Sequence, residues 1–200
     1  ESDLPSGRFM FMTQNLGYDA WHVEKIGIDM SMFNGKLQTN RFEVRTDFAL
    51  LTANIRANMT KSQMMEPTTI PFDAEIHVDD IRLAALPESM QALMRPTLSN
   101  AYDGRFGSAD DILAVDGLGK AVITAKGPYD KVNTELDFEM NDIHVYGETL
   151  SRIRLRASYD HASRVAGIQA LNAWFDPLEE GERRRPAFTL NALNFDMRKN

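Results

Sequence analysis

The chain has 200 residues, of which 43 % are hydrophobic and 26 % charged, and it carries a net charge of −7 at pH 7 and no cysteine. This length suffices for one sizeable domain or one elongated β-rich module, and the composition is that of a folded chain that does not, on average, span a membrane. The negative charge argues against a nucleic-acid partner, because phosphate binding requires clustered Lys and Arg, and the lack of cysteine excludes disulfides and thiolate metal sites.

The first 84 residues show the alternation of apolar and polar side chains that is typical of half-buried strands. We expect strands over residues 8–16, 23–33, 36–46, 48–60 and 70–83. Asn34-Gly35 lies between two of them and is a strong signal for a two-residue hairpin turn. The alternation breaks at Asp79-Asp80, which predicts a β-bulge there.

Residues 86–98 change character and predict one short amphipathic helix. Pro87 suits a first helical turn, and Met90, Leu93 and Met94 fall at the i, i+3, i+4 spacing of one helix face. Pro96 ends the pattern. Residues 99–117 then form a polar connection.

Strand patterns resume after this connection, over residues 119–126, 134–140, 143–146, 151–159, 165–175 and 187–197. The sequence therefore predicts a mostly β protein with a first β block at 1–84, a helix and loop at 85–117 and a second β block at 118–200. The two blocks resemble each other loosely, which favours one continuous repeat-like module over a closed barrel.

Residues 117–159 carry a resemblance to a known family. A strand ends in Gly127-Pro128 with the turn Tyr129-Asp130-Lys131, the next strand carries Leu136, Phe138 and Met140, and a later strand ends in Ala157-Ser158-Tyr159-Asp160. In this order they resemble the AsmA-like and TamB-like proteins of the bacterial envelope. The resemblance implies an elongated, curved antiparallel sheet, shaped like a taco shell or groove, with an apolar interior. It also implies a role in phospholipid movement or outer-membrane assembly.

From this resemblance we expect a non-enzymatic segment that shields phospholipid acyl chains and needs no cofactor. We expect it in the periplasm, with its parent protein anchored in the inner membrane by a segment outside this chain. Alternation alone places one set of side chains in position to line a groove: Leu51, Ala53, Ile55, Ala57, Met59, Phe72, Ile76, Val78, Leu136, Phe138, Ile153 and Leu155. The same pattern also fits the core of a β-sandwich, a structural module that could bind envelope proteins through exposed sheet edges.

Catalytic and metal-binding motifs are missing from the sequence. No HExxH, GxSxG, P-loop or GxGxxG occurs. His77 and Asp79 could place two ligands on one strand face, a spacing that metals can use, but a lone pair of this kind more often belongs to a solvated surface. Asp103, Asp110 and Asp111 lie in an oxygen-rich loop, but their spacing does not match the EF-hand loop, and a solvated loop is the safer interpretation. Glu135 and Asp137 share one face of a strand, whereas a glycosidase needs two carboxylates across a cleft.

The chain contains 11 methionines, several of them at strand positions such as Met10, Met12, Met30 and Met32. Methionine is flexible and polarizable and fills irregular apolar space. These residues would suit a surface that meets disordered lipid tails, and they would equally suit a loosely packed core.

Overall fold

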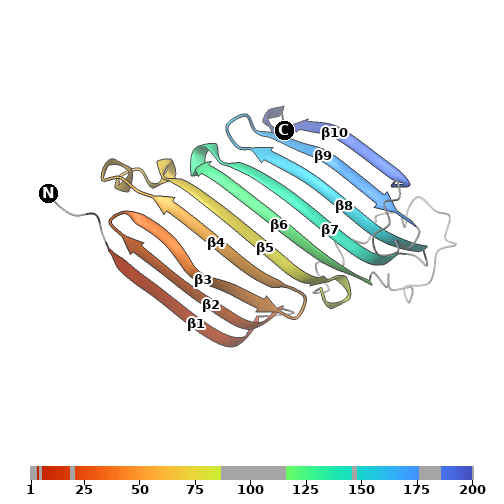
Figure 1. Ribbon diagram of the computed structural model, residues 1–200, viewed down its shortest axis with the longest axis horizontal. Coiled ribbons are helices and arrows are strands. Elements are labelled where there is room, and N and C mark those ends of the chain that lie inside the picture. The colour runs from red at the N-terminus through yellow and green to blue at the C-terminus, as the bar shows by residue number, and fades with distance from the viewer. Residues whose placement is uncertain are drawn as a thin grey trace.

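A computed structural model describes residues 4, 6–18, 21–86, 116–145, 148–175 and 186–199. Its ten strands form one open sheet in the order of the sequence, and each strand runs antiparallel to its neighbours (Figure 1). The strands are β1 (Gly7–Tyr18), β2 (Trp21–Phe33), β3 (Lys36–Thr46), β4 (Leu50–Asn58), β5 (Pro71–Arg82), β6 (Asp116–Pro128), β7 (Asn133–Val145), β8 (Glu148–Asp160), β9 (Val165–Trp174) and β10 (Phe188–Asp196).

Short 3-10 turns complete the described elements: η1 (Ser62–Met64), η2 (Pro67–Thr69), η3 (Leu83–Ala85), η5 (Tyr129–Lys131) and η6 (Met197–Lys199). The strands β1 and β10 form the two edges of the sheet and lie far apart in Figure 1. No described strand closes the sheet into a barrel or forms a second layer over it.

The predicted fold class is confirmed, since the protein is mostly β and forms one curved antiparallel sheet. The predicted hairpin turn is also present: Asn34 and Gly35 have φ angles of 49° and 75°, as a two-residue turn with both central residues at positive φ requires. The predicted helix near 86–98 lies outside the described residues, apart from Leu86, which follows η3.

The predicted blocks at 1–84 and 118–200 meet in a single sheet, because β5 pairs with β6 over most of its length. β6 begins at Asp116, two residues before the expected start of the second block. The sheet therefore continues from one block to the other, although 33 residues separate β5 from β6 in sequence.

Irregular positions interrupt the strands at intervals and help to curve the sheet. The pairing of β5 with β6 shifts register between Val78 and Ile81, and Asp80 has a φ of 53°, which confirms the bulge predicted at Asp79-Asp80. Asp142, with a φ of 51°, lies inside β7, where the register with β6 also shifts. Such bulges bend a strand and increase its local twist.

Little of the sheet is deeply buried. The core cluster consists of Leu83, Met140 and Ile143, and among the described residues no large side chain is fully buried. The chain exposes 14209 Å² to solvent, whereas a compact monomer of this mass exposes about 9,500 Å². A single-layer sheet accounts for much of this excess, because no described layer covers either of its faces.

Candidate functional site: an apolar sheet face

The sheet has two chemically distinct faces, because side chains alternate along every strand and the register keeps like residues opposite each other. We call one the apolar face. Its members, from β1 to β10, include Phe9, Phe11, Ile26, Ile28, Met30, Met32, Leu37, Phe42, Val44, Leu51, Ala53, Ile55, Ala57, Phe72, Ala74, Ile76, Val78, Ala121, Ile123, Ala125, Leu136, Phe138, Met140, Ile153, Leu155, Ala157, Ile168, Leu171, Phe188, Leu190, Leu193 and Phe195.

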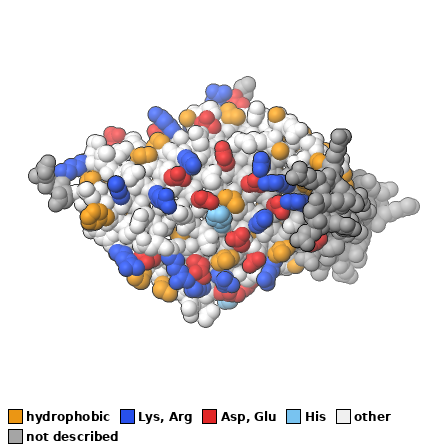
Figure 2. Space-filling model, in the orientation of Figure 1, with side chains coloured by type: hydrophobic (Ala, Val, Ile, Leu, Met, Phe, Trp, Pro, Cys, Tyr) orange, Lys and Arg blue, Asp and Glu red, His pale blue; other side chains and the backbone are white. Residues whose placement is uncertain are grey.

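The opposite surface, which we call the polar face, carries most of the charged strand residues. They include Arg8, Lys25, Asp29, Glu43, Arg56, Asp73, Glu75, His77, Lys120, Lys126, Glu135, Asp137, Glu139, Arg152, Arg154 and Arg156. Figure 2 views this face, where Lys and Arg side chains are interspersed with Asp and Glu across the strands.

The residues predicted to line a groove all come together on the apolar face, except that Met59 lies one residue beyond the end of β4. In β4 and β5, Leu51 lies opposite Val78 and Ala53 opposite Ile76. In β7 and β8, Phe138 lies opposite Leu155. The backbone N–H of Met59 donates to the carbonyl of Gly35 at 2.8 Å, which holds this residue beside the turn between β2 and β3.

β6 joins these two groups, and it was not part of the predicted lining. Ile123 lies opposite Ile76 on one side and Leu136 on the other, and Ala121 lies opposite Val78 and Phe138. The i, i+2 spacing of Ala121 and Ile123 was visible in the sequence. The sequence nevertheless did not indicate which face the two residues occupy, because Val122 between them is also apolar, although it lies on the polar face.

Small side chains lie among larger ones on the apolar face, as along β4, where Ala53 and Ala57 flank Ile55. Ala74, opposite Ile55, and Ala121, between Val78 and Phe138, are each 6 % exposed. Met140 is 4 % exposed and lies over Gly119, where an added Cβ would come within 2.8 Å of the methionine methyl carbon. The apolar face is therefore packed at these positions, although no described layer lies above it.

Exposure of large side chains on the apolar face is concentrated at its two edges. Phe9 on β1 is 58 % exposed and Phe195 on β10 is 47 % exposed. In contrast, Ile55, Leu136 and Phe138 in the middle strands are half-buried. Side chains on a curved apolar surface shield one another most where strands lie on both sides of them. This graded exposure leaves a wide apolar strip that runs across all ten strands.

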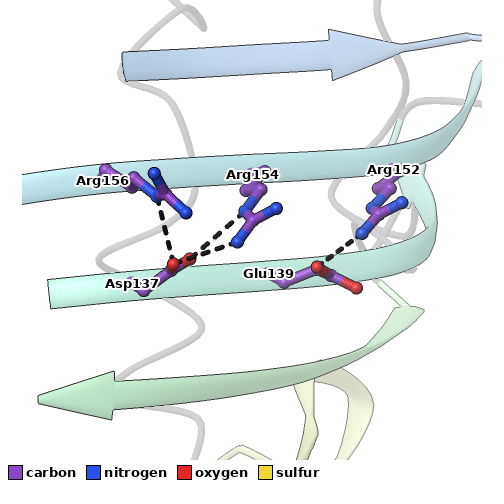
Figure 3. A network of polar contacts seen from close by, with 5 residues as sticks. All are labelled: Asp137, Glu139, Arg152, Arg154 and Arg156. Carbon is purple, nitrogen blue, oxygen red and sulfur yellow. Dashed lines mark hydrogen bonds and ion pairs between the residues drawn. The ribbon is translucent and has the colours of Figure 1, made fainter. Parts of the chain in front are cut away.

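An ion-pair ladder occupies the polar face behind the second half of this strip (Figure 3). Arg154 on β8 donates from Nε and Nη2 to the carboxylate of Asp137 on β7, at 3.3 and 3.1 Å. Arg156 donates to the same carboxylate at 3.1 Å, and Arg152 donates to Glu139 at 2.6 Å. The Arg152 guanidinium also lies 5.6 Å from the ring centre of Trp174 on β9.

Arginines lower the pKa of several carboxylates on the polar face. Hydrogen bonds from Arg154 lower the pKa of Asp137. Burial acts to raise the pKa of Glu139, but hydrogen bonding and charge from Arg152 outweigh it and the pKa is lowered. Near the other edge, hydrogen bonds from Arg8 and Asn40 lower the pKa of Asp29 to about 2. The polar face is thus a neutralised charged surface, suited to contact with water.

The polar residues that could have carried chemistry do not converge. His77 Nε2 lies 2.8 Å from Glu75 Oε1, so the imidazole is directed along the strand to Glu75. Within the described ranges, no group of three or more His, Asp or Glu side chains could hold a metal ion. Asp137 is paired with arginines, whereas Glu135 is exposed. Asp103, Asp110 and Asp111 lie outside the described residues.

The methionines singled out in the sequence divide between the two faces. Met30 and Met32 lie on the apolar face, whereas Met10 and Met12 lie on the polar face of β1, opposite Asp29 and Gly27. The alternation of β1 alone could not show this, because residues 9–12 are all apolar.

Comparison of the chain with protein-family models, with curated protein sequences and with solved structures gives no match. The described helices are all short 3-10 turns, and none is long and apolar enough to cross a membrane. The functional assignment therefore depends on the two faces of the sheet.

Proposed function

We propose that this chain is a non-enzymatic segment of an AsmA-like or TamB-like envelope protein, and that its apolar face shields phospholipid acyl chains on their way between membranes. In this proposal the segment works in the periplasm, and its parent protein is anchored in the inner membrane. One observation carries the proposal above all: the apolar face continues over ten strands with no described layer covering it.

The dimensions and chemistry of this strip suit an acyl chain. Neighbouring strands in a sheet are about 4.8 Å apart, so ten strands present a strip of roughly 45 Å. An acyl chain that lies along such a strip removes its own apolar surface and that of the protein from water, at about 25 cal/mol per Å². The half-buried side chains of the middle strands, such as Ile55 and Phe138, supply contacts without requiring a deep pocket.

The other face supports the same assignment. Ion pairs such as Arg154–Asp137 and Lys25–Glu43 lie on it, so these charged groups meet opposite charges beside the solvent. A protein that bridges an aqueous compartment needs one wet surface and one apolar surface along its whole length. An ordinary sandwich needs a second sheet, and all ten described strands belong to one sheet.

The test is native mass spectrometry with lipid extraction, on protein purified without detergent from bacterial cells. We expect co-purified phospholipid in the unaltered chain and its loss in the variants Ile55→Asp and Phe138→Asp. The matched control is Asn54→Asp, which adds the same charge next to Ile55 but on the polar face. A ligand-free unaltered protein, or equal lipid loss in the control, would overturn the proposal. Circular dichroism confirms that each variant is folded.

A further inference from the structure

The edge strand β1 carries large exposed apolar side chains on both faces. Phe9 and Phe11 lie on the apolar face, while Met10 and Met12, which are 58 % and 59 % exposed, lie on the polar face. No charged residue occurs from Phe9 to Gly17. The strand at the other edge, β10, keeps the two-faced pattern, with Thr189 and Asn191 on its polar face.

β1 lacks the usual protection of an edge strand. Proteins normally cover such edges or place Lys or Pro on them, because unpaired backbone groups attract other strands. The one charged residue described in β1, Arg8, is paired with Asp29 on the neighbouring β2. Ser6, just before β1, lies near the turn between β2 and β3, where its Oγ accepts a hydrogen bond from the backbone N–H of Asn34 at 3.1 Å.

We propose that the outer edge of β1 pairs with β1 of a second copy of this chain, about a two-fold axis normal to the sheet. Such an axis makes the two β1 strands antiparallel and keeps both apolar faces on the same side. The inference goes beyond the proposed function and does not depend on it. Its consequence is one continuous sheet with an uninterrupted apolar face across both copies.

Self-pairing explains why the polar face of β1 carries methionine. With Phe11 opposite Phe11 of the second copy, Met10 lies opposite Met12, so each methionine covers the other. Arg8 then lies opposite Gln14, and no like charges meet. Every side chain between Phe9 and Thr13 gains an uncharged neighbour in this register.

Pairing of β1 with β10 of another copy fits the side chains less well. Met10 and Met12 would then lie beside polar side chains such as Asn191, and would stay exposed. That arrangement would also leave a free β1 and a free β10 at the ends of each assembly, and would grow into filaments. Self-pairing through β1 closes after two copies.

The contact is modest in size. Phe9, Met10, Phe11 and Met12 expose together roughly 400 Å² per copy, given typical side-chain areas of 150–250 Å². Two copies with their backbone ladder therefore approach the lower end of specific interfaces. We accordingly expect a reversible dimer whose population depends on protein concentration.

Sedimentation velocity across the micromolar range tests the dimer. We expect the double variant Met10→Lys with Met12→Lys to raise the dimer dissociation constant at least roughly tenfold, because it removes apolar contact and adds like charges at the interface. These side chains are exposed, so the variant should melt like the unaltered protein. The matched control, Asn191→Lys with Asn194→Lys on β10, should leave the dimer unchanged.

Cysteine cross-linking identifies the edge, because the chain contains no cysteine of its own. Met10→Cys combined with Met12→Cys should give a disulfide-linked dimer on mild oxidation, whereas Asn191→Cys with Asn194→Cys should not. A monomer at all concentrations, a dimer that survives the lysine variant, or filaments that cross-link through β10 would each overturn the proposal.

Discussion

Asp137 and Arg154 form a hydrogen-bonded ion pair although they do not lie directly opposite each other. The register places Arg156 opposite Asp137 and Arg154 opposite Glu139. Arg154 nevertheless reaches diagonally to Asp137, and Arg152 reaches diagonally to Glu139 (Figure 3). The long arginine side chain spans the diagonal between neighbouring strands, so each carboxylate is bound by an arginine two residues from its register partner.

Removal of Asp137 from the ladder should cost stability. We expect Asp137→Asn to lower the free energy of unfolding by about 0.5–1 kcal/mol, because it breaks two partly exposed ion pairs at once. Urea denaturation measures the loss. The control is Glu135→Gln on the same strand and face, where the side chain is exposed, and it should change stability by less than about 0.5 kcal/mol. Equal effects of the two variants would contradict the role assigned to the ladder.

Acid should weaken the sheet through the same carboxylates. Asp29, Glu43, Asp137 and Glu139 all have a pKa lowered in the folded state, with that of Asp29 at about 2. Groups of this kind stabilise the folded state above their ordinary pKa values of 3.8 and 4.5. Their contribution is lost as the pH falls from there through the folded values.

We therefore expect the free energy of unfolding to fall steadily below about pH 4.5, and to level off only near the folded pKa values. Urea titrations at a series of pH values measure this slope. The variant Asp137→Asn lacks one of the linked groups and should show a shallower slope. A stability that stays flat between about pH 5 and about pH 2 would contradict the prediction.

The turn between β2 and β3 should not tolerate a side chain at Gly35. This residue has a φ of 75°, and an added Cβ would lie 2.4 Å from the carbonyl oxygen of Met59. We expect Gly35→Ala to destabilise the protein by about 2 kcal/mol or more, from strain and from displacement of the backbone near Met59. Gly17→Ala is the control, because no atom lies within 4 Å of its added Cβ, and its melting temperature should remain near that of the unaltered protein.

Much of the fold could be predicted because the strands are regular and adjacent in sequence. The bounds predicted for β3 match those observed, and the turn at Asn34-Gly35 and the bulge at Asp79-Asp80 were visible as local signals. β7 was predicted as two strands, 134–140 and 143–146, but it is one strand. Asp142 adds a residue at positive φ, so Met140 and Ile143 share one buried cluster although their spacing is odd.

Properties that depend on pairing could not be predicted. Arg152, Arg154 and Arg156 alternate visibly in the sequence, but their partners follow only from the register between β7 and β8. The direct pairing of β5 with β6 is likewise a long-range contact, because 33 residues lie between Arg82 and Asp116. The sequence showed apolar residues on both faces of β1, but only the order of the strands shows that β1 lies at the edge of the sheet.

Truncation of side chains should distinguish the core cluster from the open apolar face. Met140 is 4 % exposed and packs with Leu83 and Ile143, so Met140→Ala should lower the free energy of unfolding by about 2–4 kcal/mol. Ile55 is half-buried on the open face, and Ile55→Ala should cost only about 1 kcal/mol. Urea denaturation of the lipid-free protein measures both values.

The loss of stability in Ile55→Ala, compared with that in Met140→Ala, distinguishes an open apolar face from a covered one. If another layer covers the apolar face, Ile55 is a core residue and its truncation leaves a cavity that costs as much as the one at Met140. If the face is open, the loss at Ile55 stays small without lipid and grows when lipid binds, because only the folded protein offers the strip to an acyl chain. Equal losses in lipid-free protein would therefore contradict an open face, and with it the shielding of acyl chains.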